Sequence, residues 1–132
     1  MEAGFPVMVR VDPMIPVEGW EHLYSCLFDR LNALDLKGVV IGTLRAYPGL
    51  IWRIGNELKS MLTERGGDGR YHLPWNLRLD MYKLAFSKLR YEYMGVCKEN
   101  GSLWGILARE FKKKFLCNCT CDKITVSVRP VF

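Results

Sequence analysis

The chain has 132 residues, of which 49% are hydrophobic and 25% charged, values typical of one globular domain spanning residues 1–132. It contains no run of about 18 apolar residues, which argues against a transmembrane helix, and its first residues lack the basic and apolar regions of a signal peptide. An odd number of cysteines, five, fits a reducing compartment. We therefore expect an intracellular protein that is neither secreted nor membrane-spanning.

The positive charge is concentrated in the C-terminal half. Residues 1–66 hold seven Lys or Arg against eight Asp or Glu, a net charge of −1, whereas residues 67–132 hold twelve against six, a net charge of +6. Such asymmetry favours an anionic partner, namely nucleic acid, an acidic membrane surface or an acidic protein. The alternative is a basic face that is simply solvated.

The first elements are a strand and a helix. Alternation of apolar residues over 5–11 predicts a half-buried strand. Pro6 places this strand near a sheet edge or makes it begin late, and Asp12-Pro13 should end it. A wide apolar stripe at helical spacing then predicts a helix over residues 17–34.

The next segments are less regular. The apolar run over residues 36–44 fits either a short buried strand or an apolar loop. Pro48 can occupy the first turn of a second helix, over residues 49–63. Three glycines and an aspartate over residues 66–69 predict a surface loop.

The C-terminal half mixes both periodicities. Alternation over residues 71–80 predicts extended structure. Residues 81–90 fit either a strand or a helix, and of the two we favour a helix. A strand should follow and end near Cys97. Ser102 is the expected N-cap of a last helix, and a terminal strand should cover residues 124–128.

The last helix should carry three consecutive lysines in its final turn, where cations suit the helix dipole; these are Lys112, Lys113 and Lys114. Taken together, the elements predict an α+β fold. We expect about three helices packed against a small, mostly antiparallel sheet.

A Cys-x-Cys-x-Cys alternation suggests zinc binding by Cys117, Cys119 and Cys121. In a strand these thiols would share one face with successive Cα atoms about 7 Å apart, so the backbone would have to bend around an ion. Ordinary reduced cysteines are the alternative. A fourth ligand would come from His22, His72 or Cys97.

Catalysis has little support in the sequence. Neither His22 nor His72 has a neighbouring Ser or Cys in a recognisable nucleophile motif. The loop at residues 66–69 lacks the Lys-Ser/Thr pair of a phosphate-binding P-loop. We therefore expect a protein that is not an enzyme and needs no cofactor, zinc excepted.

Basic residues interleaved with aromatic residues give the stronger signal. Lysine clusters bind phosphate groups, and neighbouring aromatic rings can stack on unpaired bases or dock on lipid. The alternative for the aromatic residues is a place in the core. The first candidates for an anion-binding, nucleic-acid-binding or lipid-binding site are Arg109, Lys112, Lys113 and Lys114, and the second are Arg78, Lys88 and Arg90.

Several segments follow one another in a distinctive order: the strand FPVMVRV, the amphipathic segment WEHLYSCLFDRLNAL, the apolar KGVVIG and the Pro-led YPGLIWRIGNEL, with GRYHLP and YEYMGVCKENGS later in the chain. This order of elements resembles the globular core of rhabdovirus matrix proteins. It implies a viral structural protein, in a host cell or virion, that self-associates and links nucleocapsid to acidic membrane. The chain departs from that family by lacking a long basic N-terminal tail and a Pro-Pro-x-Tyr motif.

The function that these patterns indicate is a small, basic, non-enzymatic interaction protein of viral matrix type. It would bind nucleocapsid, nucleic acid or acidic membrane through its C-terminal half. The alternative is a zinc-stabilised viral accessory or regulatory module that binds a host protein or RNA.

Overall fold

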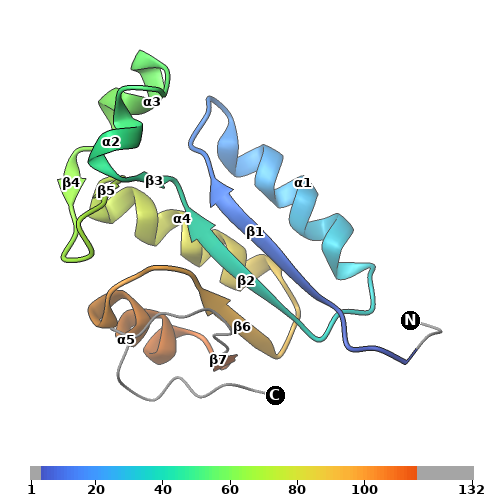
Figure 1. Cartoon of the computed structure of the whole chain (residues 1–132). Helices are drawn as coiled ribbons and strands as arrows, with labels where there is room; N and C mark the ends of the chain where they lie inside the picture. The colour runs from blue at the N-terminus through green and yellow to red at the C-terminus, as the bar shows by residue number, and fades with distance from the viewer. Residues whose placement is uncertain (1–3, 116–132) are drawn as a thin grey trace.

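A parallel sheet organises the molecule (Figure 1). The structure, a computed structural model, describes residues 4–115. The strands lie in the order β1-β2-β6-β7, and every neighbouring pair is parallel. Their bounds are β1 (Met8–Met14), β2 (Gly38–Thr43), β6 (Tyr93–Val96) and β7 (Lys114–Phe115).

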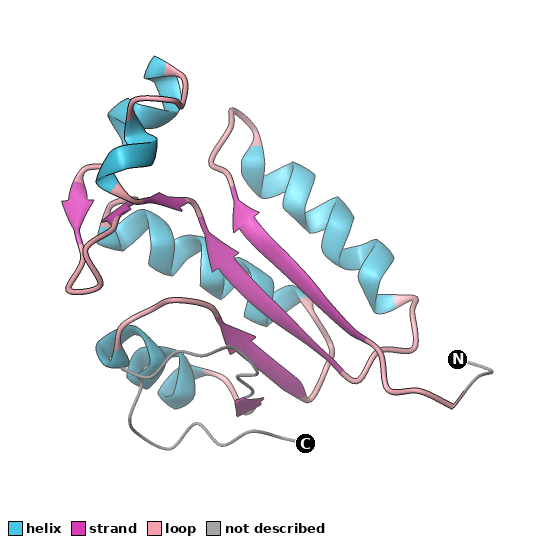
Figure 2. Cartoon of the chain, in the orientation of Figure 1, coloured by secondary structure: helices cyan, strands magenta, loops and turns pink. Residues whose placement is uncertain are grey.

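Three long helices connect these strands, and a smaller antiparallel sheet is inserted after β2. The long helices are α1 (Trp20–Asn32), α4 (Trp75–Lys88) and α5 (Gly101–Glu110). The insertion comprises β3 (Arg45–Ala46), α2 (Pro48–Ile51), α3 (Asn56–Met61), β4 (Glu64–Arg65) and β5 (Tyr71–His72). Figure 2 shows that the arrowheads of β1, β2 and β6 point toward this insertion, which therefore lies at the carboxyl edge of the parallel sheet.

The prediction of a mostly antiparallel sheet is wrong. Each neighbouring strand pair of the main sheet is separated in sequence by a helix, and such crossovers bring strands back parallel. All six residues of β2 are buried, which is typical of a parallel strand covered on both faces. Five helices, two of them a single turn or little more, replace the predicted three within residues 4–115.

Two local predictions also fail. Asp12-Pro13 does not end the first strand, since both residues lie within β1, where the pairing register shifts between Val11 and Met14. The alternation over residues 71–80 continues as strand only through His72, since Trp75 begins α4. β1 does lie at the end of the strand order, as Pro6 indicated.

The last helix is shorter than predicted and begins earlier. Its N-cap is Asn100, whose Oδ1 accepts a hydrogen bond from the backbone N–H of Leu103 at 2.9 Å, in place of Ser102. It ends at Glu110, so the three lysines lie beyond it. The predicted strand over 124–128 lies outside the described residues.

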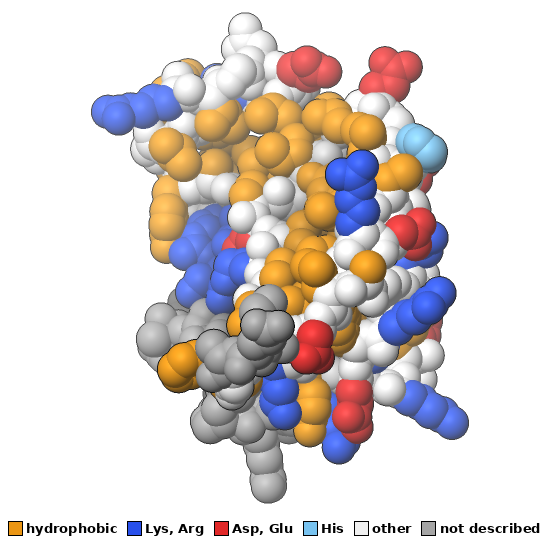
Figure 3. All heavy atoms as spheres, turned by 90° about the vertical axis from the view of Figure 1, so that its right-hand side faces the viewer, with side chains coloured by type: hydrophobic (Ala, Val, Ile, Leu, Met, Phe, Trp, Pro, Cys, Tyr) orange, Lys and Arg blue, Asp and Glu red, His pale blue; other side chains and the backbone are white. Residues whose placement is uncertain are grey.

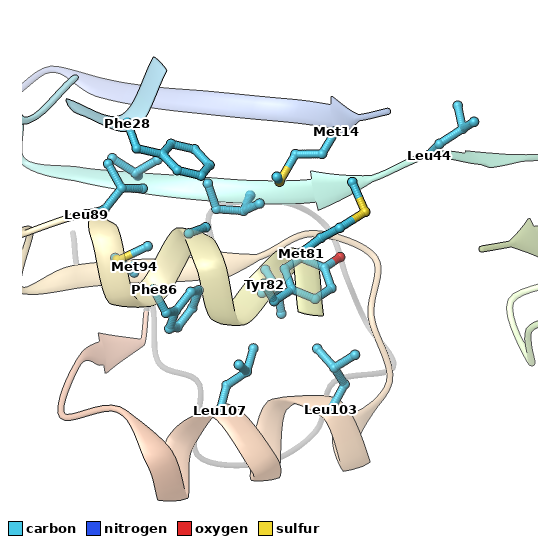
Figure 4. Close-up of a cluster of buried hydrophobic side chains, with 14 of the residues drawn as sticks. Met14, Phe28, Leu44, Met81, Tyr82, Phe86, Leu89, Met94, Leu103 and Leu107 are labelled. Carbon is cyan, nitrogen blue, oxygen red and sulfur yellow. The ribbon is translucent and has the colours of Figure 1, made fainter. Parts of the chain in front are cut away.

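The main core lies between the sheet and the three long helices. Strand β2 contributes Val39 and Ile41, and β6 contributes Met94 and Val96, while the intervening residues of these strands face the opposite side. Helix α4 packs against β2 and against both other long helices. Figure 4 shows the buried side chains of α4 between those of α5 below and those of the strands above. The largest fully buried side chains of the core include Phe28 of α1, Met81, Tyr82 and Phe86 of α4, and Leu103 and Leu107 of α5.

Side-chain hydrogen bonds join the C-terminal ends of α1 and α4 at the amino edge of the sheet. The Asn32 amide donates to the carbonyl of Lys88 at 2.8 Å, and its Oδ1 accepts from the N–H of Arg90 at 2.9 Å. The Tyr91 hydroxyl donates to the carbonyls of Leu31 and Leu34. These bonds satisfy carbonyl groups that a helix end leaves without intrahelical partners.

The outer side of α1 carries exposed apolar side chains. Leu23 is 54% exposed and Leu27 37% exposed. Figure 3 shows hydrophobic side chains gathered over this face, with charged groups around them. No helix within residues 4–115 combines the length and the apolar character needed to cross a bilayer.

Replacing Phe28 with Ala tests the packing of α1 on the sheet. Phe28 is fully buried, so the change should lower the free energy of unfolding by about 3–5 kcal/mol. Leu23→Ala on the same helix removes an exposed side chain and should change it by less than about 0.5 kcal/mol. Urea denaturation of both variants measures the difference, and equal losses would contradict the assigned helix face.

Candidate functional site at the carboxyl edge of the parallel sheet

A buried ion pair lies where the parallel strands end. Arg78, in the first turn of α4, donates from Nη1 to Glu99 Oε2 at 2.6 Å, and their side chains are 6% and 1% exposed. The same guanidinium donates to Glu64 Oε2 at 3.0 Å and to the carbonyl of Leu73 at 2.9 Å. Arg78 therefore connects α4, the β6–α5 loop and the small sheet through hydrogen bonds to three acceptors.

Two hydroxyl groups complete this network on the Glu99 side. The Tyr82 hydroxyl donates to Glu99 Oε1 at 2.8 Å, and the Thr43 hydroxyl lies 3.3 Å from Tyr82 and 3.4 Å from Glu99. Burial, reinforced by the negative charge of Glu99, raises the pKa of Tyr82 well above its usual value, so the phenol remains a donor. We call the set Thr43, Glu64, Arg78, Tyr82 and Glu99 the carboxyl-edge network.

A pocket of about 400 Å³ opens beside this network, between the β4–β5 hairpin and the β6–α5 loop. Its position agrees with the rule that ligands of parallel sheets bind outside the carboxyl ends of the strands. We call it the edge pocket. It is lined by Glu64, Arg65, Gly66, Gly67, Asp68, His72, Trp75, Arg78, Lys98, Glu99, Asn100 and Gly101.

His72 forms one wall of the edge pocket and is 4% exposed. Its Nε2 lies 3.1 Å from Asp68 Oδ1, while the buried Nδ1 has no hydrogen-bond partner in the described part of the chain. Burial raises the pKa of Asp68, but hydrogen bonds from the Arg70 N–H and from His72 outweigh it, so the pKa is lowered overall. Gly66 lies so close to both side chains that a Cβ there would overlap them.

The carboxylates of the edge pocket have hydrogen-bond donors, whereas two of its cations have no carboxylate partner within residues 4–115. Each of its three carboxylates accepts hydrogen bonds from a buried or neighbouring donor; for Glu64 these are the Trp75 N–H and Arg78, which hold its pKa below the usual value. Two cations, Arg65 and Lys98, have no ion pair to a carboxylate within residues 4–115, and Arg65 instead contacts the ring and hydroxyl of Tyr71.

Lys98 also has an unusual backbone. Its φ of 57° lies in the left-handed region, which side chains other than those of Gly, Asn and Asp rarely adopt. Such conformations persist where the surrounding structure imposes them, and they occur often at functional sites. Lys98 lies in the turn between β6 and α5, directly at the carboxyl edge.

A second polar cluster lies on the opposite face of the sheet from the main core. Arg45 binds Asp12 in a bidentate manner, with Nη1–Oδ1 2.8 Å and Nη2–Oδ2 3.1 Å. Arg10 Nη1 lies 2.9 Å from Cys97 Sγ and 3.6 Å from Asp12 Oδ2, and Arg45 Nη2 lies 3.9 Å from the same sulfur. We call Arg10, Asp12, Arg45 and Cys97 the thiol cluster.

Charge pairing sets the ionisation of the two central members of this cluster. Burial raises the pKa of Asp12, but hydrogen bonding and the charge of Arg45, with that of Arg10, outweigh burial and lower it overall. Burial lowers the pKa of Arg45, but the hydrogen bond and the charge of the Asp12 carboxylate outweigh burial, so the pKa is raised overall. Asp12 and Arg45 are therefore both charged at neutral pH.

The basic residues that the sequence predicted as one anion-binding site lie in separate surroundings. Arg78 is buried in the carboxyl-edge network. Lys113 Nζ donates to the carbonyls of Leu89 and Tyr91, and partial burial lowers its pKa. The others lie at the surface: Lys114 pairs with Glu92 at 2.9 Å, Lys88 pairs with Asp29 at 3.0 Å, and Arg90, Arg109 and Lys112 are exposed.

The predicted zinc ligands Cys117, Cys119 and Cys121 lie outside the described residues. The three candidates for a fourth ligand occupy different sites: the exposed His22 lies on α1, and His72 and Cys97 belong to the edge pocket and the thiol cluster. Within residues 4–115, no group of three His, Cys, Asp or Glu side chains is placed to hold a metal ion.

Sequence reasoning missed several residues of these two sites, among them Asp12, Thr43, Arg45, Tyr82 and Glu99. The signal that could have identified three of them is their position directly after an apolar strand pattern: Thr43 and Arg45 follow the run over residues 39–41, and Glu99 follows the strand that ends near Cys97. In a parallel sheet these positions meet at one edge.

Comparison of the chain with protein-family models, curated proteins and solved structures finds no match.

Replacing Arg78 with Met tests the carboxyl-edge network. The change leaves Glu99 buried without its charge partner and should lower the free energy of unfolding by about 3–5 kcal/mol. Adding Glu99→Gln to the same protein should recover part of that loss. Lys88→Met, which breaks an exposed ion pair on the same helix, should cost less than about 1 kcal/mol in the same urea titration.

Proposed function

We propose that the chain binds a small ligand carrying a carboxylate or phosphate group in the edge pocket. The observation that supports this most directly is the charge pattern of the lining. The carboxylates Glu64, Asp68 and Glu99 are each paired, whereas Lys98 and Arg65 have no carboxylate partner within residues 4–115. A bound anion would neutralise these two cations.

Two further features support an anionic ligand. The first residue of α5, Gly101, lines the pocket, and the N–H groups at the start of a helix favour negative charge. Trp75 offers an apolar surface on another wall, with the Arg78 guanidinium 5.5 Å from its ring centre. A few convergent polar groups beside an aromatic surface are typical of small-molecule sites.

The carboxyl-edge network would act as the rigid floor of this site. Arg78 and Glu99 already satisfy one another and their neighbours, so ligand binding need not reorganise them. Preorganised sites bind more tightly because less ordering is required on association. The role of Lys98 would then be direct contact with the anion, in a position that its left-handed backbone maintains.

Lys98→Asn tests this proposal, because asparagine tolerates the left-handed backbone while the charge is removed. We expect inorganic phosphate or succinate to bind the unmodified protein saturably, and Lys98→Asn to weaken that binding about tenfold. Isothermal titration calorimetry at constant ionic strength measures both affinities.

Lys112→Gln is the matched control, since it removes an exposed lysine outside the pocket and should leave the affinity unchanged. Equal affinities of the unmodified protein and Lys98→Asn would contradict the proposal. Absence of saturable binding by either anion would contradict it as well.

A second candidate function is docking on an extended polyanion, the role that the resemblance to rhabdovirus matrix proteins implies. Arg109, Lys112 and Lys114 are exposed along the stretch from the end of α5 to β7, within the half of the chain that carries a net charge of +6. Exposed cations that follow one another in this way attract phosphate groups without base specificity.

Arg109→Glu combined with Lys112→Glu tests this second function. The double variant should lose most of the binding of single-stranded RNA and of acidic phospholipid vesicles that the unmodified protein shows at low salt. Arg53→Glu combined with Lys59→Glu is the control for net charge, because it changes the charge by the same amount outside this stretch. Binding that is unaffected by the double variant, or equally reduced by the control, would exclude docking through this stretch.

A further inference from the structure

The edge pocket is larger than the anionic group that its cations would neutralise. Its volume of about 400 Å³ lies in the range of pockets that hold drug-sized molecules, so a phosphate group would fill only part of it. The two cations come from different segments, Arg65 from β4 and Lys98 from the β6–α5 turn, which lie on the same side of the molecule (Figure 1). Two positive charges suit a phosphate monoester, which carries nearly two negative charges at neutral pH.

An aromatic ring forms another wall of the pocket. Trp75 is half-buried, and the Arg78 guanidinium lies 5.5 Å from the centre of its ring. The Trp75 backbone N–H donates to Glu64 Oε1 at 2.9 Å, which holds the start of α4 against the small sheet. A ring fixed in this way gives a planar surface on which the ring of a ligand can stack with little loss of conformational freedom.

A half-exposed carboxylate lies beside that ring. The Glu64 side chain is 42% exposed, and it accepts a hydrogen bond at 3.0 Å from Arg78, the same residue that contacts the indole. Each Glu64 oxygen accepts one of these hydrogen bonds, although a carboxylate oxygen has two lone pairs. The carboxylate can therefore accept further hydrogen bonds from N–H groups of a ligand that lies against Trp75.

We propose that the edge pocket binds a free mononucleotide whose base carries an amino group. The base stacks on Trp75 and donates from its amino group to Glu64. The phosphate lies between Lys98, Arg65 and the first N–H groups of α5. This inference rests on the proposed function, because it assigns a ligand class to the same anion site.

The chemistry of the base edge predicts a preference among nucleotides. Cytosine, adenine and guanine carry an amino donor, whereas uracil, like thymine, has a carbonyl oxygen at the position of the cytosine amino group. The Glu64 carboxylate accepts from an amino group and repels a carbonyl oxygen, so it distinguishes two bases of the same size.

Calorimetric titration at constant ionic strength with three phosphate compounds tests the inference. Cytidine monophosphate and uridine monophosphate compare the two base edges, and ribose 5-phosphate carries the phosphate without a base. We expect cytidine monophosphate to bind the unmodified protein about tenfold more tightly than either of the other two.

Two substitutions assign this preference to particular side chains. Trp75→Leu should reduce the advantage of cytidine monophosphate over ribose 5-phosphate to less than about threefold, and Trp75→Phe should recover part of it. Glu64→Gln should abolish the preference for cytidine over uridine monophosphate, because an amide both donates and accepts. Circular dichroism identifies any variant that fails to fold, and the affinity ratios of the unmodified protein then decide the question.

Trp52→Leu is the matched control. It removes a tryptophan that is 78% exposed and does not line the edge pocket, so both affinity ratios should remain unchanged. A 5′-phosphorylated cytidine tetranucleotide presents the same groups at the end of a nucleic acid, and tighter binding of it than of cytidine monophosphate would overturn a free nucleotide as the occupant.

The results separate this inference from the proposed function. Equal affinities for the three phosphate compounds would overturn the nucleotide, while the anion site would stand because each of them still binds. Preferences that persist in folded Trp75→Leu and Glu64→Gln would overturn the inference too. If neither inorganic phosphate nor any of the three compounds binds, the proposed function fails and the inference fails with it.

Discussion

The ion pair between Arg78 and Glu99 holds together the parts of the molecule that meet at the carboxyl edge. Removing two charges from water is costly, and in this protein each charge is compensated by several hydrogen bonds: Arg78 has three acceptors, and Glu99 accepts from Arg78 and Tyr82. A network in which every member is satisfied tolerates little displacement. The same guanidinium also pairs with Glu64 of β4 and so connects the small sheet to this network, beside which the edge pocket opens.

Local patterns predicted several elements because their cause is local. The apolar stripe of α1 produces a helix over Trp20–Asn32, inside the predicted range, and Pro6 correctly indicated a terminal strand. The prediction of antiparallel strands was wrong, because strand direction depends on where the chain re-enters the sheet after each helix. A short stretch of sequence does not contain that information. The alternation over residues 71–80 misled for a different reason: α4 is buried on several sides, so its apolar residues do not form a single stripe.

The sites were harder to predict than the fold. Arg78 was predicted as a surface residue of an anion-binding site, but it is buried against Glu99. Glu99 lies 21 residues away in sequence, and only the folded chain brings the two side chains together. Lys113 likewise looked like part of a cationic run, yet its ammonium group satisfies backbone carbonyls beyond α4. Composition records the number of charges, whereas pairing between distant residues determines which of them can meet a ligand.

The bonds of Asn32 and Tyr91 at the amino edge have a consequence for how this scaffold could diversify. They secure the ends of α1 and α4 without help from any residue of the edge pocket or the thiol cluster. The loops at the two ends of the sheet are thus under separate constraints. A side chain introduced at Gly67 in the β4–β5 hairpin, where a Cβ would meet no atom within 4 Å, would change the lining of the edge pocket while the architecture beneath it persists. That position is therefore a natural site for grafting new specificity.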